Sequence, residues 1–277
     1  MLVLLKIYER NCSRRTMGYL SDAVARGLIS RQPHFNSICN YLRKDWMTDV
    51  LTDLVTASSL PLKAIETSFS VDSSGFGSST KERWYDVKYG NAEDWHKWMK
   101  AHIICGNLTK IVVGVIISPA YANDSPFFVS LVDDASKNFK IKEVLADAAY
   151  SSKENLEFVV DDKKSKVYIP FKINAKERKD SEIWNKLLHF YSFNQTEFHE
   201  KYKYRSNVET SFSALKMKFG ENLRCINEQG QINELLAKLI CYNLTVLVRS
   251  TYELNINLEE WQEFARKNTN NEDKLQK

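Results

Sequence analysis

Four side chains that could act on a phosphodiester lie close together between Lys201 and Phe219. They are Tyr202, Arg205, Glu209 and Lys216. At about 100° per residue on an α-helix, their spacing places all four within an arc of roughly 60°. An acid held between two cations and a phenol could bind a metal ion next to a phosphodiester. The spacing also suits a surface helix with one Arg to Glu pair, which contributes only a few tenths of a kcal/mol.

A first aspartate that could complete such a site is predicted at the end of a strand. Residues 65–72 alternate between apolar and polar side chains, which is typical of a half-buried strand. Ser73, Ser74 and Gly75 follow, and these residues are expected to end the strand. Asp72 is therefore predicted at the strand tip, where it could also be an ordinary turn residue.

A second aspartate, Asp147, is predicted where a strand leads into a helix. It closes the short apolar run 144–146, and Ser151 and Glu154 have the spacing of a capping box that opens a helix. The small residues on both sides of Asp147 would let a bulky polyanion approach its carboxylate. By itself, this aspartate could equally be a helix cap.

Together these motifs resemble the insertion-sequence transposases with an RNase H-like core and an Asp, Asp, Glu active site. The resemblance is closest to the branch with a Tyr-Arg-Glu-Lys signature, and it runs from about residue 65 to about residue 248. The matching residues, in chain order, are Asp72, Asp147, Tyr202, Arg205, Glu209 and Lys216. The match is specific because three motifs occur in the right order, each in its expected setting.

The resemblance implies a DNA transposase that cuts transposon ends by hydrolysis and joins the freed 3′-hydroxyl to target DNA. The implied catalytic residues and metal ligands are Asp72, Asp147 and Glu209, and the implied DNA contacts are Tyr202, Arg205 and Lys216. Three converging carboxylates need cations, and hard oxygen ligands suit Mg²⁺ or Mn²⁺, with two ions expected for in-line displacement at phosphorus. The family also implies a homodimer during synapsis and a cytoplasmic, nucleoid-associated protein.

Two alternatives stay open. A nuclease or resolvase with the same core would cut DNA without joining it. Members of the family usually carry more sequence before the first Asp, often with a DNA-binding domain, so the chain could also be a truncated or degenerate copy that binds DNA without catalysis.

Composition agrees with a protein of the reducing cytoplasm. The chain has 277 residues and a net charge of +4, so DNA affinity would depend on where its 39 Lys and Arg residues lie. Its five cysteines form no CxxC pair, which argues against a zinc site and a disulfide framework. The apolar run at residues 1–5 is too short for a signal peptide or a membrane span.

We predict an α/β protein with three regions. Residues 1–63 form a basic helical region, residues 64–250 form an RNase H-like mixed sheet flanked by helices, and residues 251–277 form a polar tail. Strands are expected at 65–72, 99–105, 110–117, 144–147 and 167–170, and helices at 16–28, 35–57, 124–138, 152–161 and 232–248. The segment 174–200 is expected to form a small helical cap.

Two further features keep a double interpretation. The aromatic and basic stretch 81–100 could stack on unpaired bases, or pack as a hairpin. His102, on the second predicted strand, could reach the carboxylates, although a hydrogen-bonded core histidine is the more common situation.

Overall fold

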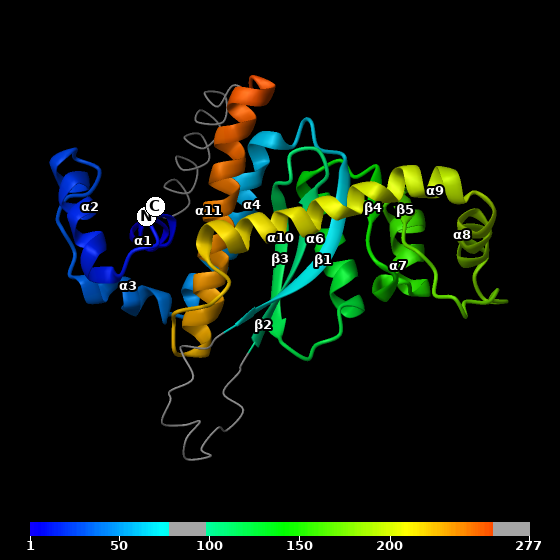
Figure 1. Cartoon of the computed structure of the whole chain (residues 1–277), viewed down its shortest axis with the longest axis horizontal. Coiled ribbons are helices and arrows are strands. Elements are labelled where there is room, and N and C mark those ends of the chain that lie inside the picture. The colour runs from blue at the N-terminus through cyan, green and yellow to red at the C-terminus, as the bar shows by residue number, and fades with distance from the viewer. Residues whose placement is uncertain (78–97, 257–277) are drawn as a thin grey trace, which may run out of the picture.

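A mixed sheet of five strands forms the centre of the protein (Figure 1), in a computed structural model that describes residues 1–77 and 98–256. The strand order is β3-β2-β1-β4-β5. The strands are β1 (Ser68–Gly77), β2 (Trp98–Gly106), β3 (Val112–Pro119), β4 (Glu143–Leu145) and β5 (Lys166–Tyr168). β1, β2 and β3 pair antiparallel, whereas β4 and β5 run parallel to β1. This mixed sheet with flanking helices confirms the predicted fold class.

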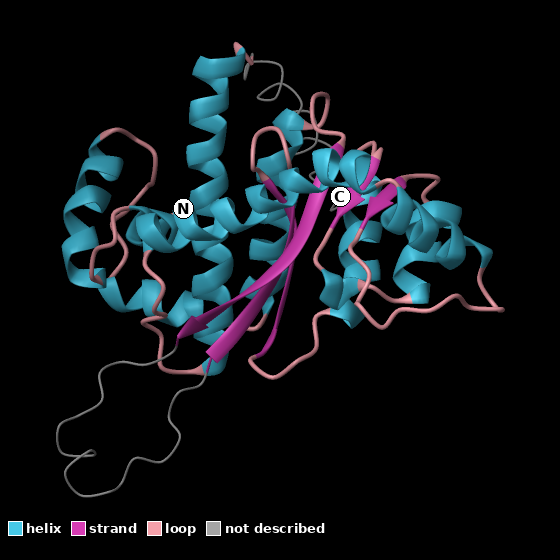
Figure 2. Cartoon of the chain, turned by 45° about the vertical axis from the view of Figure 1, so that its right-hand side comes forward, coloured by secondary structure: helices cyan, strands magenta, loops and turns pink. Residues whose placement is uncertain are grey.

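Helices cover both faces of the sheet (Figure 2). Alternation along β1 assigns the faces, because successive side chains of a strand point to opposite sides. Phe76 contacts Phe212 of α10 (Ser206–Phe219), with ring centroids 6.4 Å apart, so α10 covers the face that also carries Asp72. Phe69 contacts Phe139, just after α6 (Phe128–Asn138), so α6 lies on the opposite face.

Helix α11 (Glu228–Leu254) packs along α4 (Trp46–Ser59) and reaches β3 at the edge of the sheet. The buried Asn243 fixes this contact, because its side chain accepts a hydrogen bond from the Val112 amide at 3.0 Å and donates to the Val112 carbonyl at 2.7 Å. It also donates to Ser58 on α4 at 2.9 Å. A polar side chain buried here is therefore fully used in joining three elements.

The N-terminal residues are helical, as predicted, but one predicted helix is divided. Residues 35–57 were expected to form one helix, whereas the structure has α3 (Phe35–Leu42) and α4, separated at residues 43–45. Asn233 of α11 explains the break, because its amide donates to the carbonyls of Leu42 and Lys44 at 2.9 and 3.0 Å. These hydrogen bonds hold the chain where α3 ends and α4 begins. The two helices before them are α1 (Leu2–Tyr8) and α2 (Ser13–Ala25).

The segment before α10 forms the predicted helical cap. Its helices are α8 (Glu182–Phe193) and α9 (Gln195–Tyr202), and α7 (Lys153–Glu157), continued by a π-helical turn at Phe158–Asp162, lies next to α8. Within residues 1–77 and 98–256, no helix is both long and apolar enough to cross a membrane. Most of the aromatic stretch 81–100 and the end of the predicted tail, residues 78–97 and 257–277, lie outside the described residues.

Candidate active site

Asp72 lies in the middle of β1 and not at its tip, so the predicted strand end is wrong. Ser73, Ser74 and Gly75 remain extended because they pair with His102, Ala101 and Lys100 of β2. The tertiary pairing thus overrides the local turn tendency of these small residues. The Asp72 side chain is 17% exposed, and one of its oxygens accepts a hydrogen bond from the Ser73 amide at 2.8 Å.

Asp147 follows β4 directly, at the predicted strand-to-helix turn. The last pair between the parallel strands joins Ser70 to Leu145, so Asp72 and Asp147, each two residues further on, occupy the same register position. Neighbouring strands are about 4.8 Å apart, so the two aspartates lie close to each other where β4 ends beside the middle of β1. Asp147 caps a short 3-10 helix, and its carboxylate accepts from the Ala149 amide at 2.9 Å.

The predicted capping box at Ser151 is shifted by one residue. Ser152 is the N-cap of α7, and its hydroxyl accepts from the Asn155 amide at 3.2 Å. The 3-10 turn at residues 148–150 takes up Ser151 as its last flanking residue, which moves the start of the helix. The helix itself begins within a residue of the predicted position.

Glu209 lies in the first turn of α10, and Arg205 links it to the sheet. The guanidinium of Arg205 forms ion pairs with Glu209 and with Asp72, the latter at 3.5 Å. The structure therefore brings together an acid from the strand and an acid from the helix through a single cation. Arg205 and Asp72 are only 18% and 17% exposed, which makes their interaction less screened than a surface pair, whereas Glu209 is 52% exposed.

The charge of this site is incompletely neutralised. The pKa of Asp72 is raised from its ordinary 3.8 to about 6, mainly by burial and also by the negative charges of Asp147 and Glu209. The Ser73 amide and the Arg205 guanidinium oppose these effects. The electrostatic influence of both other acids on Asp72 indicates that all three carboxylates share one electrostatic environment.

The Tyr202 to Lys216 segment is not the single helix that the spacing predicted. Tyr202 ends α9, Arg205 lies in a 3-10 turn at residues 203–205, and α10 begins at Ser206. Tyr202 still reaches the site, because the Arg205 guanidinium lies 5.8 Å from its ring centroid. Burial raises the pKa of Tyr202, Arg205 opposes this change, and the three acids raise it further.

Lys216 is the signature residue that the structure keeps apart from the acids. Its amine pairs with Glu221 at 3.0 Å and lies 5.1 Å from the centroid of Phe76. Seven residues of helix separate it from Glu209, or about 10 Å along the axis. Lys216 therefore extends the cationic surface of α10 away from the three acids.

A fourth acid, Asp124, went unrecognised in the sequence. It lies on the opposite face of β1, where it accepts from the Ser73 hydroxyl at 2.9 Å and pairs with Lys100 at 2.6 Å. His102 is fully buried, bonds Ser118 at 2.8 Å and faces Asp124 at 3.4 Å. Burial lowers the pKa of His102 to about 4, so it is neutral at pH 7 and acts as a core histidine.

Only one local signal pointed to Asp124. Asp before Ser-Pro is a common way to begin a helix, and a 3-10 turn does begin at Ser125. Its contact with Ser73 depends on the pairing of Ser73 with His102, which local sequence does not encode. The buried Tyr150 hydroxyl lies on the same side and has no hydrogen-bond partner among the described residues.

The three acids suit divalent ions by their chemistry. As the side chains stand, no three Asp, Glu, His or Cys residues in the described part of the chain are close enough to hold one ion. Arg205 already pairs with two of the acids, and the carboxylates still raise the pKa of Asp72. Hard oxygen donors with unneutralised charge fit Mg²⁺ or Mn²⁺, provided that Arg205 moves aside.

Comparison with known proteins identifies the family of the chain. A family model described as "Transposase DDE domain" matches residues 65–244, about two thirds of the chain. The matched range includes the sheet, the three acids and α10. No curated protein matches the chain.

Proposed function

The chain belongs to the transposase DDE domain family, and from this premise we propose that it cuts DNA at transposon ends and joins the freed 3′-hydroxyl to target DNA. The observation that carries the proposal is the link between Asp72 and Glu209 through Arg205, with Asp147 at the register position of Asp72. These contacts support a site made of one acid from β1, one just after β4 and one from α10.

We assign the metal-binding role to Asp72, Asp147 and Glu209. Two divalent ions held there would activate the attacking oxygen and stabilise the leaving one. The rigid sheet and α10 would hold the carboxylates in place, so that the scissile phosphate meets a preorganised site. Water would be the nucleophile for cutting, and the 3′-hydroxyl would be the nucleophile for joining.

The cations of the signature would bind the DNA strand. Arg205, once released from its carboxylates, can hold a phosphate with two parallel hydrogen bonds. Lys216 would act as a point charge further along the strand, and Tyr202 would position the phosphate beside Arg205. Bringing two transposon ends together would require a homodimer.

The experiment is a cutting and joining assay with Mg²⁺ or Mn²⁺. Its substrate is a labelled DNA duplex that carries the terminal repeat of the transposon that encodes this chain. We expect wild-type protein to produce nicked and joined products, and Glu209→Gln to produce neither. Glu200→Gln removes an acid from the neighbouring helix α9 and should retain both activities. Asp147→Asn, like Glu209→Gln, should produce neither nicked nor joined products.

Each other outcome has a defined meaning. Cutting without joining would identify a nuclease in place of a transposase. An active Asp147→Asn or Glu209→Gln protein would refute the assignment of the acids. A wild-type protein that binds duplex but does not cut it would identify a copy without catalysis.

A further inference from the structure

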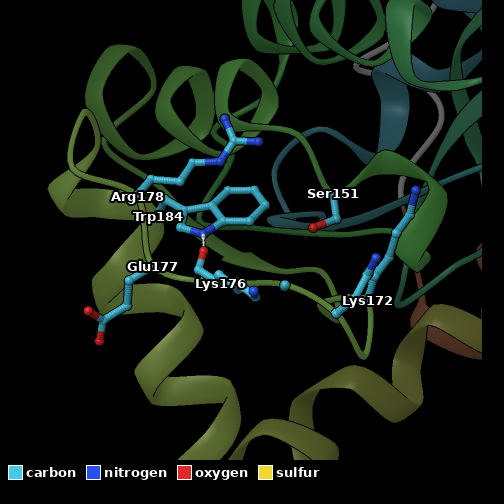
Figure 3. Close-up of a pocket in the computed structure, with 8 residues that line it drawn as sticks. Ser151, Lys172, Lys176, Glu177, Arg178 and Trp184 are labelled. Atoms are coloured by element: carbon cyan, nitrogen blue, oxygen red, sulfur yellow. Dashed lines mark hydrogen bonds between the residues drawn. The ribbon is translucent and has the colours of Figure 1, made fainter.

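A pocket of about 400 Å³ lies beside the loop that carries Asp147 (Figure 3). Ser151, the segment 172–178 and Trp184 of α8 line the pocket, and Figure 3 shows Lys172 on the same side as Ser151, with Trp184 and Arg178 on the other side. Asp147 and Ser151 flank the same 3-10 turn, so at most about 14 Å of chain joins them. The pocket is therefore a direct neighbour of the proposed active site.

The pocket is cationic. Lys172, Lys176 and Arg178 line it, together with a single acid, Glu177. Figure 3 shows Glu177 pointing away from Ser151, and its carboxylate bonds His189 of α8 at 2.5 Å. In the part of the chain that the structure describes, these three cations have no carboxylate within 4.0 Å. The amines of Lys172 and Lys176 are thus available to an anion, whereas the Arg178 guanidinium also lies over the ring of Trp184.

The backbone of this segment is held in place before any ligand binds. The amide of Arg178 donates to the Asn185 side chain, and the Asn185 amide donates to the Arg178 carbonyl, both at 2.7 Å. The Trp184 indole donates to the Lys176 carbonyl at 2.9 Å. A cationic loop fixed in this way loses little conformational entropy when it binds an anion.

The aromatic ring in the pocket is not open for base stacking. Trp184 is only 6% exposed, its ring meets Phe171 edge-on at 4.9 Å, and the Arg178 guanidinium lies 4.4 Å from its centroid. The pocket therefore offers cations and hydrogen-bond donors and no free aromatic face. This chemistry suits the phosphate backbone of a nucleic acid better than its bases.

We propose that Lys172, Lys176 and Arg178 form a phosphate-binding subsite for the DNA strand that leaves the active site past Ser151. The proposal rests on the proposed function, because that function supplies DNA as the ligand.

The first test measures binding of the full chain to the labelled end duplex over a series of salt concentrations, without divalent ions. Each phosphate contact contributes about 0.9 to the slope of log affinity against log salt. We expect Lys172→Ala and Lys176→Ala each to reduce the slope by about that amount. Lys179→Ala, an exposed lysine of the same segment outside the pocket, should leave the slope unchanged.

The second test replaces single phosphates of the duplex by neutral methylphosphonates. Affinity of the wild-type protein should fall at the positions near the cut whose phosphates contact Lys172 and Lys176, and Lys172→Ala should be insensitive to replacement at one of them. Equal slopes for all three lysine variants and wild type, or an equal slope loss in Lys179→Ala, would overturn the subsite.

These binding tests do not require cleavage. A protein that shows the Lys172-dependent phosphate contact but does not cut would retain the subsite and refute the proposed function. A protein that cuts DNA but lacks this contact would support the proposed function and refute the subsite.

Discussion

The raised pKa of Asp72 predicts that this residue destabilises the metal-free protein at neutral pH. Replacing it by Asn removes the negative charge and retains an oxygen that can accept from the Ser73 amide. Asp72→Asn should therefore stabilise the fold while abolishing the proposed activity. Residues placed for chemistry often cost stability in this way.

The magnitude follows from the two pKa values of Asp72, about 6 in the folded protein and 3.8 ordinarily. Below pH 3.8 the carboxyl is protonated in both states, so the folded protein carries no penalty. Between pH 3.8 and pH 6 the Asp72 carboxyl is ionised in the unfolded chain but mostly protonated in the folded protein, so the free energy of unfolding falls as the pH rises. Above pH 6 it is lower by the full penalty of about 3 kcal/mol. At pH 5 roughly half of it remains. This penalty already includes the attraction of Arg205, which lowers the pKa of Asp72.

The assay is urea unfolding of wild type and Asp72→Asn in EDTA at pH 5 and pH 8, because the free energy of unfolding is read from the linear dependence on urea. The gain from the substitution should be larger at pH 8. Asp133→Asn is the control with opposite sign, since a hydrogen bond from Lys163 lowers the pKa of Asp133. An equal gain at both pH values, or a loss at pH 8, would refute the reasoning.

Three other substitutions test separate parts of the structure. Arg205→Gln removes the cation between the acids, so calorimetry without DNA should show Mn²⁺ binding roughly fivefold tighter, whereas Lys216→Gln should match wild type; unchanged affinity in both would contradict the bridging role. Asp124→Ala leaves Lys100 and the Ser73 hydroxyl without their acceptor. It should lower the free energy of unfolding in urea by about 2 to 3 kcal/mol, and Asp124→Asn should lower it less. Asn243→Ala removes the hydrogen bonds that join α11 to the sheet and should cost about 2 to 4 kcal/mol, so an unchanged unfolding midpoint would count against that role.

Local patterns predicted much of the fold. Five strands and the main helices lie within a few residues of their expected positions, because alternation and helical periodicity depend on neighbours in sequence. Asp147 is a good example, since the apolar run before it and the small residues after it specify a strand and then a turn. The acid on α10 was also found locally, through its spacing from Arg205 and Lys216.

Pairing between distant segments decided the rest. Asp72 lies inside β1 because residues 73–77 pair with β2, although their own sequence favours a turn. The break between α3 and α4 depends on Asn233, about 190 residues further along the chain. Asp124 contacts Ser73 on the opposite face of β1 only through the register that sets Ser73 opposite His102.

The sequence by itself therefore determined which acids are available and the type of element that carries each of them. The tertiary structure decided where those elements meet, because register and helix packing depend on burial shared between segments far apart in the chain. Arg205 shows the difference clearly. Its pair with Glu209 follows from helical spacing, but its pair with Asp72, 133 residues away, exists only because α10 packs across β1.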